Sequence, residues 1–188
     1  MEGEDDERLL YNWSKVLNTE DSFRKVCFHI MGGGPKQQML NDAQRHFAGV
    51  RQIIPHAKRL VLFDPVLCEW QRKNIDNYLL VPEAWIRAAR QKTLLGEKAI
   101  ETFIQDFFAG ENLMLPPNQT WRHVKANIFQ VVDGKKLLFK KPDCLFQGLR
   151  NNFQLKLTRS SVAACMTADE IHEDVHQFFA KLNQILAV

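Results

Sequence analysis

Apolar residues in the first part of the chain follow two different spacings. Between 9 and 17 they recur every three to four positions, which predicts a short amphipathic helix. Between 24 and 31 every second residue is apolar, with Val26, Phe28 and Ile30 on one side, which predicts a strand. The chain is therefore expected to pass from a helix to a strand before residue 32.

Glycines and prolines divide the rest of this half into short elements. The three glycines and the proline at 32–35 end the first strand, and helical spacing resumes over 36–47 until Gly49. Apolar runs at 50–54 and 60–63 predict two further strands. The remaining elements are expected to be a helix at 67–75, a strand at 78–81 and a helix at 82–91. The predicted order, β-α-β-β-α-β-α, is an α/β arrangement around one sheet.

The second half of the chain shows the pattern of an antiparallel hairpin. Pro116-Pro117 marks a boundary, and strands are expected at 124–132 and 136–139. The Asp133-Gly134 pair between these strands is a strong signal for a two-residue hairpin turn. Two more elements complete this half, a strand at 153–157 and a C-terminal helix with Thr167 as its N-cap.

These patterns divide the chain into three parts. Residues 1–8 contain five acidic residues and one arginine and are expected to form a disordered tail. Residues 9–109 are expected to form an α/β domain, a small central sheet flanked by helices. Residues 110–188 are expected to form an α+β basic region, with an antiparallel hairpin and a C-terminal helix, that folds separately or packs with the first domain.

Composition favours a soluble intracellular protein. Hydrophobic residues make up 45% of the 188 positions, which is enough for a packed core. The four cysteines are scattered without a C-x-x-C pair, as is typical of a reduced compartment. No apolar run approaches the roughly 20 residues that span a bilayer, so no membrane partner is expected.

Several short motifs of the first half are similar to those of BRCT domains. The matching positions, from the opening strand to the V-x-x-x-W phrase of the last helix, are Phe23, Phe28, Ile30, Gly32, Gly49, Leu60, Val81 and Trp85. The resemblance covers residues 20–105, and Leu145–Leu149 resembles the opening of a degenerate second copy. Phe23, Phe28 and Trp85 are expected to belong to the structural core.

The BRCT resemblance implies a non-catalytic module that binds a protein partner, phosphorylated or acidic, in a nuclear setting of genome maintenance or chromatin. Phosphopeptide-binding members have a Ser or Thr before the strand-ending glycine, and Met31 occupies that position here. By this resemblance Lys73 supplies positive charge, with Arg72 beside it. Backbone N–H groups of the glycine turn can also hold an anion without any side chain, and the residues concerned are Gly32, Gly33 and Gly34.

A basic stretch in the second half is a second candidate surface. Residues 122–159 contain nine lysines and arginines but only two acidic residues, Asp133 and Asp143. Such a stretch attracts nucleic acid or an acidic protein, although it is also compatible with an ordinary solvated face. The candidate surface residues are Arg122, Lys125, Lys135, Lys136, Lys140 and Lys141.

Two enzyme interpretations stay open as alternatives. A strand followed by the glycine turn at 32–34 is compatible with a nucleotide- or S-adenosylmethionine-binding site, with Asp64 reaching a ribose hydroxyl. His172 and His176 fit the zinc-binding pattern H-E-x-x-H, but no further ligand follows them before the chain ends. We expect this protein to have no catalytic residue, no cofactor and no bound metal ion.

Overall fold

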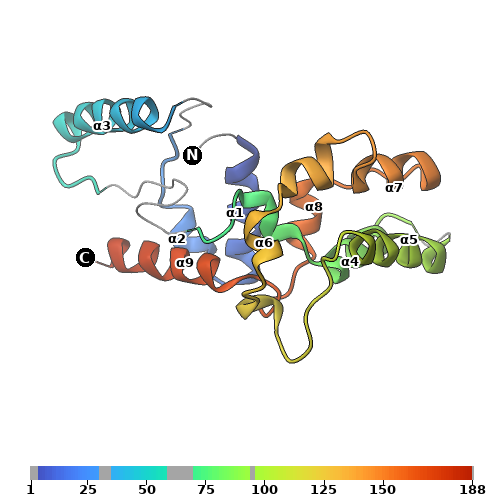
Figure 1. Ribbon diagram of the computed structural model, residues 1–188. Helices are drawn as coiled ribbons and strands as arrows, with labels where there is room; N and C mark the ends of the chain where they lie inside the picture. Colours follow the sequence, from blue (N-terminus) through green and yellow to red (C-terminus); the bar gives the residue numbers. More distant parts are fainter. Residues whose placement is uncertain (1–3, 30–34, 59–69, 94–95, 188) are drawn as a thin grey trace.

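The fold is helical. The computed structural model describes residues 4–29, 35–58, 70–93 and 96–187, and every regular element within these ranges is a helix (Figure 1). The α-helices are α1 (Glu4–Val16), α2 (Glu20–Phe23), α3 (Lys36–Ile53), α4 (Pro82–Arg90), α5 (Glu97–Gly110), α6 (Asn127–Val131), α7 (Leu145–Phe153), α8 (Arg159–Ala164) and α9 (Glu173–Leu186). Two short 3₁₀-helices, η1 (Ile75–Leu79) and η2 (Trp121–His123), and a π-helical turn, η3 (Lys136–Lys140), complete the elements. The predicted α/β fold with a central sheet and an antiparallel hairpin is therefore wrong.

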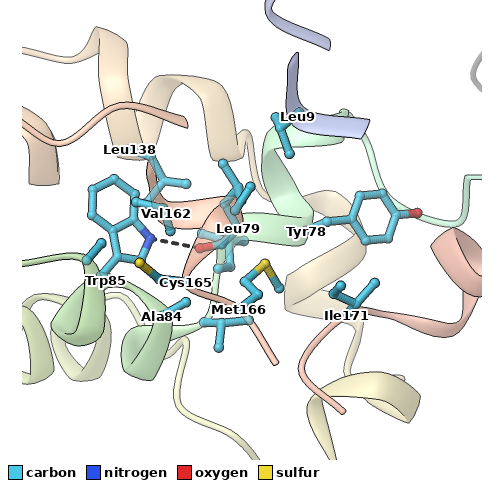
Figure 2. Packing of buried hydrophobic residues seen from close by; sticks show 14 of the residues in the cluster. Leu9, Tyr78, Leu79, Ala84, Trp85, Leu138, Val162, Cys165, Met166 and Ile171 are labelled. Atoms are coloured by element: carbon cyan, nitrogen blue, oxygen red, sulfur yellow. Dashed lines mark hydrogen bonds between the residues drawn. The ribbon is translucent and has the colours of Figure 1, made fainter. Parts of the chain in front are cut away.

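One hydrophobic core draws on both halves of the sequence. Trp13 of α1 is fully buried, and its indole N–H contacts the sulfur of Met166 just after α8 at 3.2 Å. Trp85 of α4 is also fully buried, and its indole N–H donates to the carbonyl of Leu79 at 2.9 Å. Figure 2 shows Trp85 facing Leu138 and Val162, which come from the second half of the chain. The first half thus packs directly onto the region after Pro116.

The segments predicted as strands in the first half have other structures. The stretch from 24 to 29 forms no regular element, although Phe28 packs against Phe23 with ring centroids 4.8 Å apart. The run at 50–54 continues α3 as far as Ile53, because Gly49 does not end that helix. Residues 78–81 are buried at the end of η1 and just before α4. A short apolar run fits a buried helical turn as well as a strand, so its composition alone does not decide between them.

The predicted hairpin is replaced by consecutive helical turns. Residues 127–131 form α6, and Asp133-Gly134 leads into η3 instead of turning between two strands. The expected strand at 153–157 contains the end of α7 and a segment without regular structure in which Leu155 and Leu157 are buried. Apolar residues at 124, 129, 132, 137 and 138 are spaced irregularly enough for short helices to bury them.

The ends of the described chain are helical. The helix α1 begins at Glu4, inside the stretch expected to be a disordered tail. At the other end, Glu170 accepts from the backbone N–H of Thr167 at 2.8 Å, as in a capping box, but only a turn forms there. The C-terminal helix α9 begins later, and the His172 side chain caps it by accepting from the backbone N–H of Asp174.

None of the helices in the described ranges is both long and apolar enough to cross a membrane. The strand expected at 60–63, with Leu60 and Asp64, and most of the glycine turn lie outside the described residues.

Replacing Trp85 with alanine should lower the free energy of unfolding by about 3 to 5 kcal/mol, because a fully buried indole is lost. Trp85→Phe should cost less, about 1 to 3 kcal/mol, since a smaller aromatic ring is kept, and the loss is part of the buried volume together with the donor to Leu79. Denaturant unfolding followed by circular dichroism measures both values. Equal and small losses in the two variants would contradict this placement of Trp85.

Candidate interaction surface

Lysines gather on the outer side of η3. Lys136, Lys140 and Lys141 are exposed and Lys135 is half-buried, whereas Leu137 and Leu138 between them are buried. The backbone N–H of Lys141 donates to the carbonyl of Lys136 at 2.9 Å, which places these two residues one above the other on a single π-helical turn. The buried leucines fix the turn from inside, so the lysines must point outward.

Asn77 holds the chain that leads into this turn. Its side chain is fully buried, and its amide N–H₂ donates to the carbonyls of Phe129 at 3.0 Å and Val132 at 2.8 Å. Its amide oxygen accepts from the backbone N–H of Gly134 at 2.9 Å. Three hydrogen bonds from one side chain therefore set the path from α6 to η3.

Lys73 joins the lysines of η3. Its backbone N–H donates to the carbonyl of Gln130 at 2.9 Å, and its ammonium group lies 3.7 Å from the carboxylate of Asp133. The ammonium group of Lys136 lies 3.8 Å from the same carboxylate. We call Lys73, Lys135, Lys136, Lys140 and Lys141 the lysine surface.

Asp133 is the acidic group within this surface. Burial opposes its charge, but the backbone N–H of Lys136 and the ammonium groups of Lys73 and Lys136 outweigh it and lower the pKa of Asp133. Asp133 is therefore ionised at neutral pH and offsets one positive charge. In the described part of the chain, Lys140 and Lys141 have no ion-pair partner, and Lys135 is near enough to the buried Asp76, which Arg159 already pairs, to favour its charged form. The surface therefore keeps an excess of positive charge.

The arginines at the two ends of the basic stretch have structural partners. Arg122 lies 2.7 Å from Glu173 at the start of α9. Arg159 lies 2.7 Å from Asp5 of α1, bonds Asp76 of η1 and covers the ring of Phe139. These two arginines connect helices to one another, in contrast to the lysines between them. Lys125, also predicted for the surface, is exposed just before α6.

Arg72 does not belong to the exposed surface. It is 4% exposed, and its guanidinium donates to the carbonyl of Asn77 at 2.6 Å while lying against the rings of Tyr78 and Phe129. Burial lowers the pKa of Arg72 to about 10, and Tyr78 and Asp174 oppose that shift. The structure thus separates Arg72 from its neighbour Lys73, while Gly32, Gly33 and Gly34 lie outside the described residues.

A buried carboxylate, that of Asp174, lies against Tyr78 of η1. Asp174 accepts from the hydroxyl of Tyr78 and from the backbone N–H of Gln71, the latter at 3.0 Å, and lies beside the His172 imidazole. Burial opposes the charge, but these groups outweigh it and lower the pKa of Asp174. For the Tyr78 hydroxyl, burial first and then the Asp174 charge raise the pKa far above its ordinary range. The cluster is packed in the core and ties η1 to α9.

The two histidines of the H-E-x-x-H pattern have separate roles. His172 is buried at the N-terminus of α9, and His176 bonds the carbonyl of Ala168 at 3.1 Å. In the described part of the chain, no group of three or more His, Cys, Asp or Glu side chains is arranged to hold a metal ion.

No family model, curated protein or solved structure matches the chain. BRCT membership and a nuclear location stay predictions, although the sheet that the resemblance implies is contradicted by the helical fold. The nucleotide-binding alternative also depended on a strand before the glycine turn, and residues 24–29, which begin that predicted strand, form none.

Sequence reasoning did not single out the residues that organise this region. Asn77 and Tyr78 directly precede the apolar run 79–81, and polar residues beside such a run are a signal for burial with a partner. Asp174 stands among polar residues, so its local sequence carries no such signal. The partners lie more than fifty positions away for Asn77 and close to a hundred for Tyr78, so spacing could not identify them.

Gly134→Ala should destabilise the protein, because an added Cβ would lie 2.6 Å from the Asn77 amide oxygen and 2.9 Å from its backbone nitrogen. Since backbone atoms cannot move aside easily, we expect a loss of about 1 to 3 kcal/mol in the free energy of unfolding. Gly110→Ala is the matched control, because its added Cβ meets nothing within 4 Å. A Gly134→Ala protein as stable as this control would show that the contact with Asn77 is absent.

Asp174→Asn should reduce stability by about 1 to 3 kcal/mol at neutral pH, because the buried carboxylate and its charge-assisted hydrogen bonds are lost. The folded-state pKa of Asp174 is lowered, so its contribution is complete above the unfolded value near pH 4 and is lost as the pH falls through the folded value. The stability difference between wild type and variant should therefore shrink below about pH 4. Urea titrations at several pH values measure it, and a difference that does not change with pH would exclude this role.

Proposed function

We propose that this protein is a non-catalytic interaction module that binds an acidic protein partner through the lysine surface. The observation that carries the proposal is the exposed set of lysines on η3, which have buried leucines behind them and an excess of charge over Asp133. Ammonium groups on long side chains attract carboxylates or phosphates from several directions and need no preformed pocket.

The rigid support of the lysines favours a binding role over a merely solvated face. Lysines that only improve solubility need no fixed backbone. The lysines of η3, in contrast, come directly after the 129–134 segment, which three hydrogen bonds from the Asn77 side chain hold in place. Lys73 is brought to the same place from a segment about sixty residues earlier by its bond to Gln130. Positive charges from two distant segments therefore converge on one area.

Charge reversal tests this proposal. The double change Lys140→Glu and Lys141→Glu should weaken binding of a labelled polyglutamate peptide about tenfold or more, because two attractions become repulsions. Binding of the wild-type protein should also weaken steadily as salt is raised, since exposed charges are screened. Fluorescence anisotropy at several salt concentrations gives both results.

The double change Lys92→Glu and Lys98→Glu is the matched control, because both lysines are exposed, lie outside the lysine surface and change the net charge by the same amount. It should leave the affinity within about twofold of the wild type. An equal loss in the control and the double variant would mean that only net charge matters. A single-stranded oligonucleotide of the same charge, tested in parallel, should bind more weakly than the peptide, and the reverse order would make nucleic acid the ligand.

A further inference from the structure

Two exposed apolar side chains lie next to the lysine surface. Ile128 and Val131 of α6 are 38% and 56% exposed. Because they are three residues apart on one helix, their side chains are neighbours on the same face. Single exposed apolar residues are common on protein surfaces, but an adjacent pair with lysines on the neighbouring segments is a more specific feature.

The rest of α6 is anchored from the inside. Phe129, between the two exposed residues, is 1% exposed, and its ring makes an edge contact with Trp121 at 5.7 Å between centroids. The guanidinium of Arg72 covers another part of the same ring. The outward direction of Ile128 and Val131 is thus a consequence of how Phe129 is buried.

Positive charges flank the apolar pair on both sides. Lys125 is exposed just before α6, and the lysine surface begins just after it at Lys135. Lys73 lies beside α6 itself, because its backbone N–H donates to the carbonyl of Gln130, the next-to-last residue of that helix. The carboxylate of Asp133 lies between two of these groups, 3.7 Å from the ammonium of Lys73 and 3.8 Å from that of Lys136.

We infer that α6 and the lysine surface form one docking site for an acidic protein segment that also carries apolar side chains. The inference rests on the proposed function and names the kind of partner. The apolar side chains of such a segment would cover Ile128 and Val131, while its carboxylates would meet Lys73, Lys125 and Lys136. A nucleic-acid backbone offers phosphates but leaves the apolar pair uncovered, so the combination favours a peptide.

Two labelled peptides of equal length and charge test the inference. Both carry glutamates, and one has leucines every three to four positions where the other has glutamines. The wild-type protein should bind the leucine peptide about tenfold more tightly, because partial burial of a few apolar side chains is enough for that ratio. The double variant Ile128→Gln and Val131→Gln should bind the two peptides equally.

Met114→Gln is the control, because Met114 is 43% exposed and lies outside this site. It should keep the wild-type preference, and thermal melts should show that all variants stay folded. The inference would be overturned if the wild type bound the two peptides equally. If the double variant Lys140→Glu and Lys141→Glu still lost that binding, the proposed function would stand. Binding of neither peptide would remove both. Concentration-dependent self-association that disappears in the glutamine variant would assign the apolar pair to a second copy and overturn the inference as well.

Discussion

The side chain of Asn77 is the contact on which the lysine surface depends. It is fully buried and uses both amide hydrogens and its oxygen on the backbone of the 129–134 segment. An amide in the core is stable only when its polar atoms are paired, so the segment has little freedom to move away. The carbonyl of the same residue accepts from Arg72, which extends the constraint to the ring of Phe129.

The structure divides charged residues into those that join helices and those that face solvent. Arg122 and Arg159 connect the basic stretch to α9, α1 and η1, and Asp174 connects α9 to Tyr78. Arginine suits such contacts because its planar group binds carboxylates and covers rings at the same time. The lysines between the arginines are left outside, which explains how a stretch with a large charge excess can both stabilise the fold and present a surface.

The first helix and the location of the basic surface could be predicted from the sequence, but the structure of the segments expected to be strands could not. The spacing of apolar residues at 9–17 indicated a helix, and the charge excess of 122–159 indicated where a basic surface could lie. The predicted sheet was wrong for two reasons. Short apolar runs such as 78–81 fit a buried helical turn as well as a strand. The glycine of Asp133-Gly134 is needed because the backbone passes close to Asn77 there, and it does not mark a hairpin turn. Arg72 and Lys73 show the limit most clearly. They are adjacent in sequence, yet one is buried against Tyr78 and the other is exposed beside Asp133, and neither contact can be read from the spacing.

A nuclear magnetic resonance titration shows whether an acidic peptide binds at α6 and η3. Adding a leucine-containing glutamate peptide to the ¹⁵N-labelled protein should shift the backbone amide signals of Lys73, Lys125, Ile128, Val131 and residues 135–141. Signals from α3, which Figure 1 places on the far side of the molecule from α7, should stay unchanged. Shifts concentrated in α3, or no shifts at saturating peptide, would contradict the account.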